Sequence, residues 1–249
     1  MNLCIDIGNT TVKAAIFNEG KAVETFRFPF PGIDNLKEIK EKYPEADKVI
    51  ICSVRPAGEV INRIEEEGFS KLICLDKDTP LPVTNMYRTT GSLGYDRVAA
   101  IAGANNICPE SNVLVVDAGS AITFDLVTAD NKYMGGNISP GMEMRFRALN
   151  RFTSGLPLVQ MSELEEMDFE VKLMSDNTRD AIIYGVCNSV ILEVEGYIKR
   201  LGEIFKPLKI IFTGGDANFF DKRLKYPIFV NSNLIFIGLN RILEYNEEF

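Results

Sequence analysis

Short apolar runs separated by acidic and glycine-rich turns recur along the chain. Two of them, residues 3–5 and 113–116, are each followed at once by an Asp-x-Gly loop. Apolar runs of this length, bounded by turn residues, predict buried strands. Each loop, Asp6–Thr10 and Asp117–Ala121, therefore places a carboxylate and a flexible backbone at a strand end. Two such ends facing each other could hold a polyphosphate.

The first half of the chain predicts three strands followed by alternating helices and strands. The first loop joins two strands, and Asn18-Glu19-Gly20 forms the next turn. A segment rich in Pro, Gly and Thr, residues 79–93, predicts a loop. The expected strands are 11–17, 21–28, 48–53 and 72–75, and the expected helices are 35–42, 57–67 and 96–105.

From residue 113 the same plan restarts. The pattern predicts strands at 113–116, 121–128 and 209–212, a short strand around Tyr133, a turn-rich segment at 135–141, and helices at 142–149, 179–201 and 234–245. This repetition indicates a duplicated α/β domain. We expect domains at residues 1–112 and 113–249, with the last helix a candidate to pack back on the first domain.

Composition excludes several classes of protein. The 249 residues are 46% hydrophobic, which is ample for real cores, and the net charge of -8 argues against a nucleic-acid partner. Asp6 interrupts the N-terminal apolar stretch, and no run approaches the roughly 18 to 20 residues that span a bilayer, so we expect neither a signal peptide nor a membrane partner. The five cysteines are scattered without a CxxC pair, so we expect most of them to be buried thiols in a reducing cytoplasm.

The chain contains no histidine. This removes serine-histidine and cysteine-histidine catalysis and histidine-ligated zinc, so a general base must be a carboxylate, lysine, tyrosine or thiol. A Walker-type phosphate loop is also excluded at the first loop, because that motif must lead into a helix and carry GxxxxGK[ST].

The first loop has the residue types of a phosphate site. Gly8 permits close approach of the backbone, the hydroxyl and amide residues that follow it offer hydrogen-bond donors, and Lys13 adds a positive charge. Asp6 cannot bind phosphate directly, so we expect it to act on Mg²⁺, directly or through water. An ordinary hairpin whose aspartate caps a turn is the alternative, and the loop alone leaves both open.

The residues Gly94-Tyr95-Asp96-Arg97 open a predicted helix, where backbone N–H groups and the helix dipole favour an anion. With histidine absent, Asp96 is the candidate base for accepting a hydroxyl proton during phosphoryl transfer. Arg97 could pair with a substrate carboxylate or the transferring phosphate. A plain helix cap at Asp96 is the alternative.

Taken together in order, five motifs resemble type III pantothenate kinase, within the superfamily of acetate and sugar kinases, Hsp70 and actin. They cover essentially the whole chain and are Asp6–Thr10 with Lys13, Gly94–Arg97, Asp117–Ser120, Gly135–Gly141 and Thr213–Asp216. The resemblance implies an α/β fold of two duplicated actin-like (ribonuclease H-like) domains, each a mixed five-stranded sheet with flanking helices.

It also implies an activity and a set of cofactors. A member of this family phosphorylates pantothenate with ATP to 4'-phosphopantothenate, the first step of coenzyme A biosynthesis, in the cleft between its domains. The expected cofactors are ATP, Mg²⁺ and K⁺ or NH₄⁺, and the expected protein is a cytoplasmic homodimer. A nonenzymatic accessory or regulatory protein of the same fold, and a superfamily kinase acting on another small hydroxy acid, are the alternatives.

Residue roles carry over position by position. Asp96 remains the candidate base, and Asp117 matches the family residue that binds the monovalent cation. Ser120 matches the family residue that contacts ATP, a position where the family usually has Thr. On residue type alone, Tyr87 could simply pack its ring, and Asn177 or Thr178 could cap a helix. The nucleotide residues are Asp6, Ile7, Gly8, Asn9, Thr10, Thr11, Val12, Lys13 and Ser120, and the substrate residues are Tyr87, Gly94, Tyr95, Asp96, Arg97 and Thr178.

Two sets of charged residues outside these motifs are expected to lie on the surface. Arg145, Arg147 and Arg151 are spaced by two and four residues, so they cannot all share one helical face. A solvated surface or a dimer contact is expected for them. The acidic residues from Glu163 to Glu170 likewise predict surface in preference to a metal site.

Overall fold

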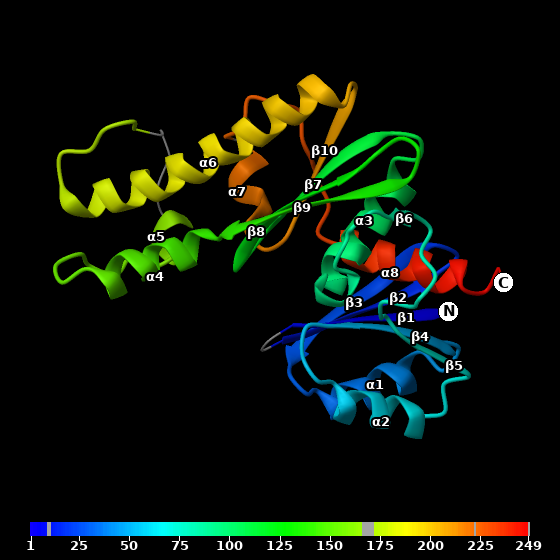
Figure 1. Cartoon of the computed structure of the whole chain (residues 1–249). Coiled ribbons are helices and arrows are strands. Elements are labelled where there is room, and N and C mark those ends of the chain that lie inside the picture. Colours follow the sequence, from blue (N-terminus) through cyan, green and yellow to red (C-terminus); the bar gives the residue numbers. More distant parts are fainter. Residues whose placement is uncertain (9–10, 166–171, 222, 249) are drawn as a thin grey trace. The chain divides into compact units, whose positions relative to one another are not determined.

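The computed structural model describes residues 1–8, 11–165, 172–221 and 223–248 (Figure 1). The chain divides into two compact units. Unit 1 comprises residues 1–113, 126–135 and 233–249, and unit 2 comprises residues 114–125 and 136–232. The nucleotide contacts predicted for Asn9 and Thr10, and most of the acidic segment 163–170, lie outside the described residues.

The sheet of unit 1 has the strand order β3-β2-β1-β4-β5. Strands β1, β2 and β3 pair antiparallel in that succession, and β4 and β5 continue the sheet in parallel from β1. Buried aliphatic residues dominate β1 and β4, as expected for central strands covered on both faces. The bounds are β1 Asn2–Ile7, β2 Thr11–Asn18, β3 Lys21–Pro29, β4 Lys48–Ser53 and β5 Lys71–Cys74.

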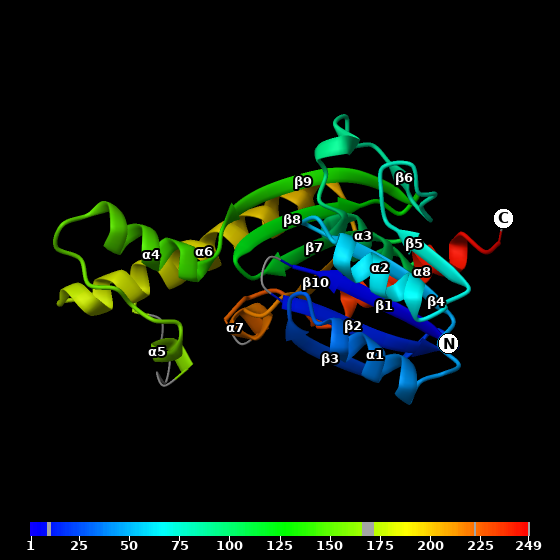
Figure 2. The same ribbon diagram turned by 90° about the horizontal axis from the view of Figure 1, so that it is seen from below.

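Two pairs of helices cover this sheet. Helices α1 (Ile33–Lys42) and α2 (Gly58–Glu66) lie side by side on one face, and α3 (Tyr95–Ile107) and α8 (Leu234–Tyr245) lie on the other (Figures 1 and 2). Helices α3 and α8 approach each other closely at Gly238 of α8. A Cβ at that position would stand 1.7 Å from the carbonyl oxygen of Ala99 on α3, so the contact requires glycine. The last helix of the chain therefore packs against α3 within unit 1.

The second sheet has the order β11-β10-β7-β8-β9-β6, six strands where five were expected. Two short strands of this sheet, β6 and β11, were not predicted from the pattern. Strand β6 has two residues, which the segment 79–93 contributes in parallel to β9, ahead of a 3₁₀ turn at Thr90–Ser92. The bounds are β6 Thr84–Asn85, β7 Asn112–Ala118, β8 Ala121–Val127, β9 Lys132–Pro140, β10 Leu208–Thr213 and β11 Phe229–Val230.

Strand β9 corrects the turn expected at residues 135–141. The strand continues to Pro140, and its glycines serve close packing. A Cβ on Gly136 would stand 1.9 Å from the carbonyl oxygen of Phe124, so only glycine fits there. Glycine within a strand can mark such a close approach of backbones as readily as a turn.

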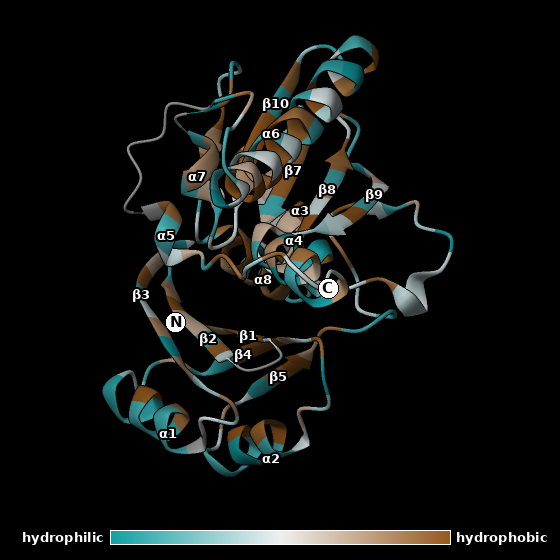
Figure 3. Ribbon diagram, turned by 90° about the vertical axis from the view of Figure 1, so that its left-hand side faces the viewer, coloured by the Kyte–Doolittle hydropathy of each residue, from teal (hydrophilic) through white to brown (hydrophobic). Residues whose placement is uncertain are grey.

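The core of unit 2 packs α6 against the apolar sides of β7, β8 and β10. Figure 3 shows these strands and much of α6 as predominantly hydrophobic. The helices of this unit are α4 Met142–Phe152, α5 Ser162–Glu165, α6 Thr178–Ile204 and α7 Ala217–Asp221.

Helix α6 also corrects an expectation from composition. The helix is 27 residues long and contains an 18-residue window with a mean hydropathy of 1.3, so by length and composition it could cross a membrane, and half of that window is buried inside the protein. Its buried residues belong to the unit 2 core, which is the pattern of a core helix. They include Ile182, Ile183, Val186, Cys187, Val190, Val194 and Ile198.

Candidate functional site

Asp6 lies near the end of β1 with a different kind of neighbour on each side. In the sheet register it stands opposite Lys13 of β2 and opposite Cys52 of β4. Asp6 is only 8% exposed and Cys52 is fully buried, whereas Lys13 is half-buried. The strand pairing therefore places one carboxylate and one ammonium group together at the first loop.

Burial raises the pKa of Asp6 from 3.8 to about 6. The positive charge of Lys13 opposes this rise, and the negative charge of Asp96 adds to it. Cys52 has its pKa raised by burial and then by the charge of Asp6, so it stays a neutral thiol. An ionised Asp6 is thus destabilised by its surroundings, and a bound cation would offset that cost.

Asp96 is fixed at the start of α3. Its Oδ1 accepts a hydrogen bond from the backbone N–H of Arg97 at 2.8 Å. A Cβ on Gly94 would stand 2.5 Å from the same oxygen, so the glycine leaves space for this orientation. The carboxylate is half-buried and interacts electrostatically with Asp6, although the two residues are far apart in sequence.

The remaining described residues of the first loop contribute mainly backbone. The N–H of Gly8 donates to the carbonyl oxygen of Thr11 at 2.9 Å, which closes the turn between β1 and β2. Ile7 and Val12 are fully buried members of the unit 1 core. Only main-chain groups of these two residues are available to a ligand, so any side-chain contacts must come from their neighbours.

An aromatic and cationic group surrounds the predicted substrate residue Tyr87. Its ring stacks on the buried Tyr133 at 6.4 Å between centroids, and the guanidinium carbon of Arg97 lies 5.7 Å from the Tyr87 ring centre. A Cβ on Gly135 would approach the same ring at 3.2 Å. Tyr87, Gly94, Tyr95 and Arg97 are thus brought into one unit with Asp96.

The second Asp-x-Gly loop, in unit 2, is enclosed by backbone. A Cβ on Gly141, just before α4, would stand 2.0 Å from the carbonyl oxygen of Gly119. Gly214, with φ of 91°, approaches both Asp117 Oδ1 and the carbonyl of Ala118, and a Cβ there would lie 2.4 Å and 2.2 Å from these oxygens. Oxygen atoms of this kind are suitable ligands for a hard cation.

Ser120 and Thr178 both belong to unit 2 and are exposed. The carbonyl oxygen of Ser120 accepts a hydrogen bond from Gly141 N–H at 3.1 Å, which fixes the backbone of the loop. Thr178 is the first residue of α6, and Asn177 caps that helix by accepting from the N–H of Asp180 at 3.0 Å. The Thr178 side chain is therefore not needed as the cap.

Within the described residues, no three His, Cys, Asp or Glu side chains form a group able to hold a metal ion. Mg²⁺ in nucleotide enzymes commonly uses one or two carboxylates plus substrate phosphates. Asp6, buried and electrostatically coupled to Asp96, fits a carboxylate of that kind.

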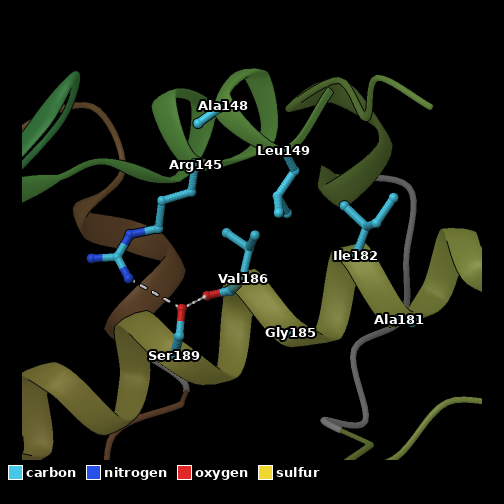
Figure 4. Close-up of a pocket in the computed structure, with 8 residues that line it drawn as sticks. All are labelled: Arg145, Ala148, Leu149, Ala181, Ile182, Gly185, Val186 and Ser189. Carbon is cyan, nitrogen blue, oxygen red and sulfur yellow. Dashed lines mark hydrogen bonds between the residues drawn. The ribbon is translucent and has the colours of Figure 1, made fainter. Parts of the chain in front are cut away.

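Arg145 corrects an expectation from the sequence. It is bound within unit 2, where it reaches from α4 to Ser189 on α6 (Figure 4) and forms an ion pair with Glu193. Arg147 pairs with Glu143 one turn away on α4 and remains exposed, in keeping with a surface position.

Sequence reasoning did not find Cys52, Tyr133 or the role of Arg145. Cys52 meets Asp6 only through the register of two parallel strands, and Tyr133 meets Tyr87 only through β6. The spacing of the arginines along α4 does not indicate that Arg145 binds Ser189 and Glu193 on α6.

Solved structures define the class of this fold. A conserved protein from Campylobacter jejuni, described as a candidate Baf family transcriptional activator, matches with a TM-score of 0.63 and 22% identity, covering 99% of this chain and 100% of that one. A ROK hexokinase from Thermus thermophilus matches with a TM-score of 0.54 and 14% identity over 99% of both chains. The protein has an α/β, actin-like fold with two mixed sheets and flanking helices, which confirms the predicted fold class.

Sequence comparisons narrow this class to one family. The family model for type III pantothenate kinase matches residues 2–200. A type III pantothenate kinase from Phocaeicola vulgatus is 42% identical over the full length of both chains, and one from Christiangramia forsetii is 41% identical over 99% of each. The chain belongs to the type III pantothenate kinase family.

Proposed function

We propose that this protein catalyses the ATP-dependent phosphorylation of pantothenate to 4'-phosphopantothenate, the first step of coenzyme A biosynthesis. The observation that carries the proposal is that Asp6 lies opposite Lys13 and interacts electrostatically with Asp96, all within unit 1. The chain matches members of this kinase family over its full length. A buried carboxylate, an ammonium group and a second carboxylate at a helix start provide the charges that phosphoryl transfer needs.

Asp96 is the proposed base. Its carboxylate is held by the Arg97 N–H through one oxygen and would accept the proton of the primary hydroxyl as the phosphoryl group is transferred. Arg97 would pair with the pantothenate carboxylate, and Tyr87, stacked on Tyr133, would form an adjacent wall. Gly94 and Tyr95, at the start of α3, are further proposed substrate residues, and so is Thr178.

Each of the two Asp-x-Gly loops carries proposed nucleotide contacts. Lys13 would supply positive charge to the phosphates, and the backbone from Ile7 to Val12, with the Thr11 side chain, would supply donors. Mg²⁺ would be held at Asp6, where it supplies charge neutralisation for the transferring phosphoryl group. Ser120 would donate its hydroxyl to ATP, and Asp117 would hold K⁺ or NH₄⁺.

We further propose a cytoplasmic homodimer. The support for a reducing compartment is that the five cysteines are all free thiols. Gel filtration coupled to light scattering tests the dimer, and a mass of one chain would contradict it.

Asp6, Lys13, Asp96, Arg97 and Asp117 are all retained in this chain. A scaffold that had lost catalysis would be free to lose some of these charged groups, so their joint presence favours the enzyme over a nonenzymatic accessory protein.

The test is a coupled assay of ADP release with Mg²⁺, K⁺ and ATP. We expect release to be stimulated by pantothenate and not by a panel of other small hydroxy acids. Identification of 4'-phosphopantothenate by mass spectrometry serves as the product control. Absence of pantothenate-stimulated ADP release, with bound nucleotide detected, would overturn the proposed substrate while leaving nucleotide binding intact.

A further inference from the structure

Arg145 joins two elements of unit 2 through four contacts. Its Nε donates to the carbonyl oxygen of Pro140 at 2.8 Å, and its terminal nitrogens donate to Ser139 Oγ at 2.8 Å and Ser189 Oγ at 3.1 Å. It also forms an ion pair with Glu193. The guanidinium group is planar and presents donors in a fixed fork, so these contacts determine its orientation.

Helix α6 supplies the fixed end of this arrangement. Figure 4 shows Arg145 extending from α4 to Ser189, whose hydroxyl in turn donates to the carbonyl of Val186 at 2.8 Å. Val186 is a buried member of the unit 2 core. The arginine is therefore anchored to a helix that is itself held by core packing.

The other end of the arrangement is the segment that leads into α4. Arg145 holds Ser139 and Pro140, and the next residue is Gly141. The N–H of Gly141 donates to the carbonyl oxygen of Ser120 at 3.1 Å, and its Cα faces the carbonyl of Gly119 with no space for a Cβ. A shift of Ser139 and Pro140 would therefore be transmitted to the Ser120 loop.

We infer that Arg145 is a positioning residue for nucleotide binding, which acts by holding the segment 139–141 against the Ser120 loop. This inference rests on the proposed function in taking Ser120 to contact ATP. A group that is held by a network of supporting contacts loses precision when that network is cut, and a displacement of about 1 Å can reduce catalysis by roughly a hundredfold.

The test compares Arg145→Met with Arg147→Met. Both changes remove one positive charge from α4, but Arg147 is exposed and pairs only with Glu143 among the ion pairs of the described residues. We expect Arg145→Met to weaken equilibrium binding of ADP, measured by calorimetry, by about tenfold or more, and to raise the KM for ATP by a similar factor. The KM for pantothenate and all constants of Arg147→Met should remain close to those of the wild type.

Conservative variants separate positioning from simple stabilisation. Arg145→Lys keeps the charge but cannot reproduce the fork, so we expect it to recover only part of the ADP affinity. Ser139→Ala removes one partner and should lower the affinity in the same direction by a smaller factor. It also replaces Arg145→Met as the test if that variant does not fold.

A folded variant, by circular dichroism, whose ADP affinity equals that of the wild type would overturn the inference, even if its melting temperature fell. The calorimetric measurement does not require pantothenate. If pantothenate proves not to be the substrate, the ADP-binding measurement still tests the role of Arg145. If Arg145→Met leaves ADP affinity unchanged, the proposal that pantothenate is the substrate is unaffected.

Discussion

The two Asp-x-Gly loops have the same sequence pattern but are built by different physical means. Asp6 is 8% exposed, and its pKa is raised chiefly by burial, with smaller opposing effects from the charges of Lys13 and Asp96. The Asp117 carboxylate is half-buried and is approached by the backbone of Gly214. The first loop is thus tuned by charge and burial, and the second by close packing of glycines.

This difference teaches that duplication of a fold does not duplicate its chemistry. At Asp6 a bound cation would offset the unfavourable burial of an anion, and the proposed Mg²⁺ would place its charge beside the transferring group. At the second loop the exposed Ser120 and the half-buried Asp117 are the groups proposed to contact the nucleotide and the monovalent cation. The variants below test whether each loop depends on the feature that distinguishes it.

The largest effect is expected from Asp96→Asn, which removes the proposed base and the negative charge that acts on Asp6. We expect kcat to fall by about 10²- to 10⁴-fold, because a positioned general base contributes a factor of this size. Steady-state kinetics and calorimetric ATP binding measure the two properties separately. ATP affinity and the folded state should be retained, and near-normal turnover would remove Asp96 from the role of base.

The next effect concerns pH. Burial raises the pKa of Asp6 from 3.8 to about 6, so between these values the folded chain binds the proton more tightly than the unfolded chain. The free energy of unfolding should therefore fall as pH rises from about 4 to 6, by about 3 kcal/mol from this group at 1.36 kcal/mol per pKa unit.

Urea unfolding without Mg²⁺, compared between the wild type and Asp6→Asn, isolates the Asp6 contribution. The variant should lack this part of the pH dependence.

The same titration predicts that Mg²⁺-ATP binding weakens as pH falls through the pKa of Asp6, because a protonated carboxyl is a poor ligand. Identical pH profiles for the two proteins would show that burial does not tune the first loop.

A third prediction addresses packing at the second loop. Gly214→Ala places a Cβ 2.2 Å from the carbonyl oxygen of Ala118 on a residue with φ of 91°. We expect a loss of about 1 to 3 kcal/mol in the free energy of unfolding, together with weaker nucleotide binding. Gly215→Ala is the matched control, since nothing lies within 4 Å of its Cβ position. Equal stability of the two variants, from denaturant melts, would mean that this glycine packing is dispensable.

The smallest effect is expected from the monovalent cation. Replacing K⁺ with Na⁺ should lower kcat/KM severalfold, because the cation adds charge beside the phosphates without forming or breaking bonds. Asp117→Asn should remove this preference. An activity that is indifferent to the exchange in the wild type would argue that Asp117 serves the second loop by structure alone.

Local pattern was enough to predict most elements of the fold. Alternating apolar runs and turn residues correctly predicted β1, β2, β3 and β4, and the last helix was predicted at its observed bounds, Leu234–Tyr245. These elements have strong periodicity and clear end signals. Strand β9 was cut short in the prediction because its glycines indicated a turn, whereas the fold uses them where strands approach closely.

The candidate site divides in the same way. Asp6, Asp96 and Asp117 stand out from the chain because each follows an apolar run or opens a helix, and the absence of histidine leaves carboxylates as the natural bases. The roles of Cys52 and Tyr133 were not predictable, because strand register and side-chain stacking join residues that are remote in sequence.

By itself, therefore, the sequence determined most of the elements, the chemical groups available and the family, since these depend on residue type, spacing and order along the chain. Only the tertiary structure decided that Asp6 is buried opposite Lys13 and that the charge of Asp96 raises its pKa. It also decided that Gly141 and Gly214 must lack side chains and that Arg145 is hydrogen-bonded within the protein instead of solvated. The physical reason is that burial, electrostatic coupling and steric exclusion depend on distances between segments, which local pattern does not encode.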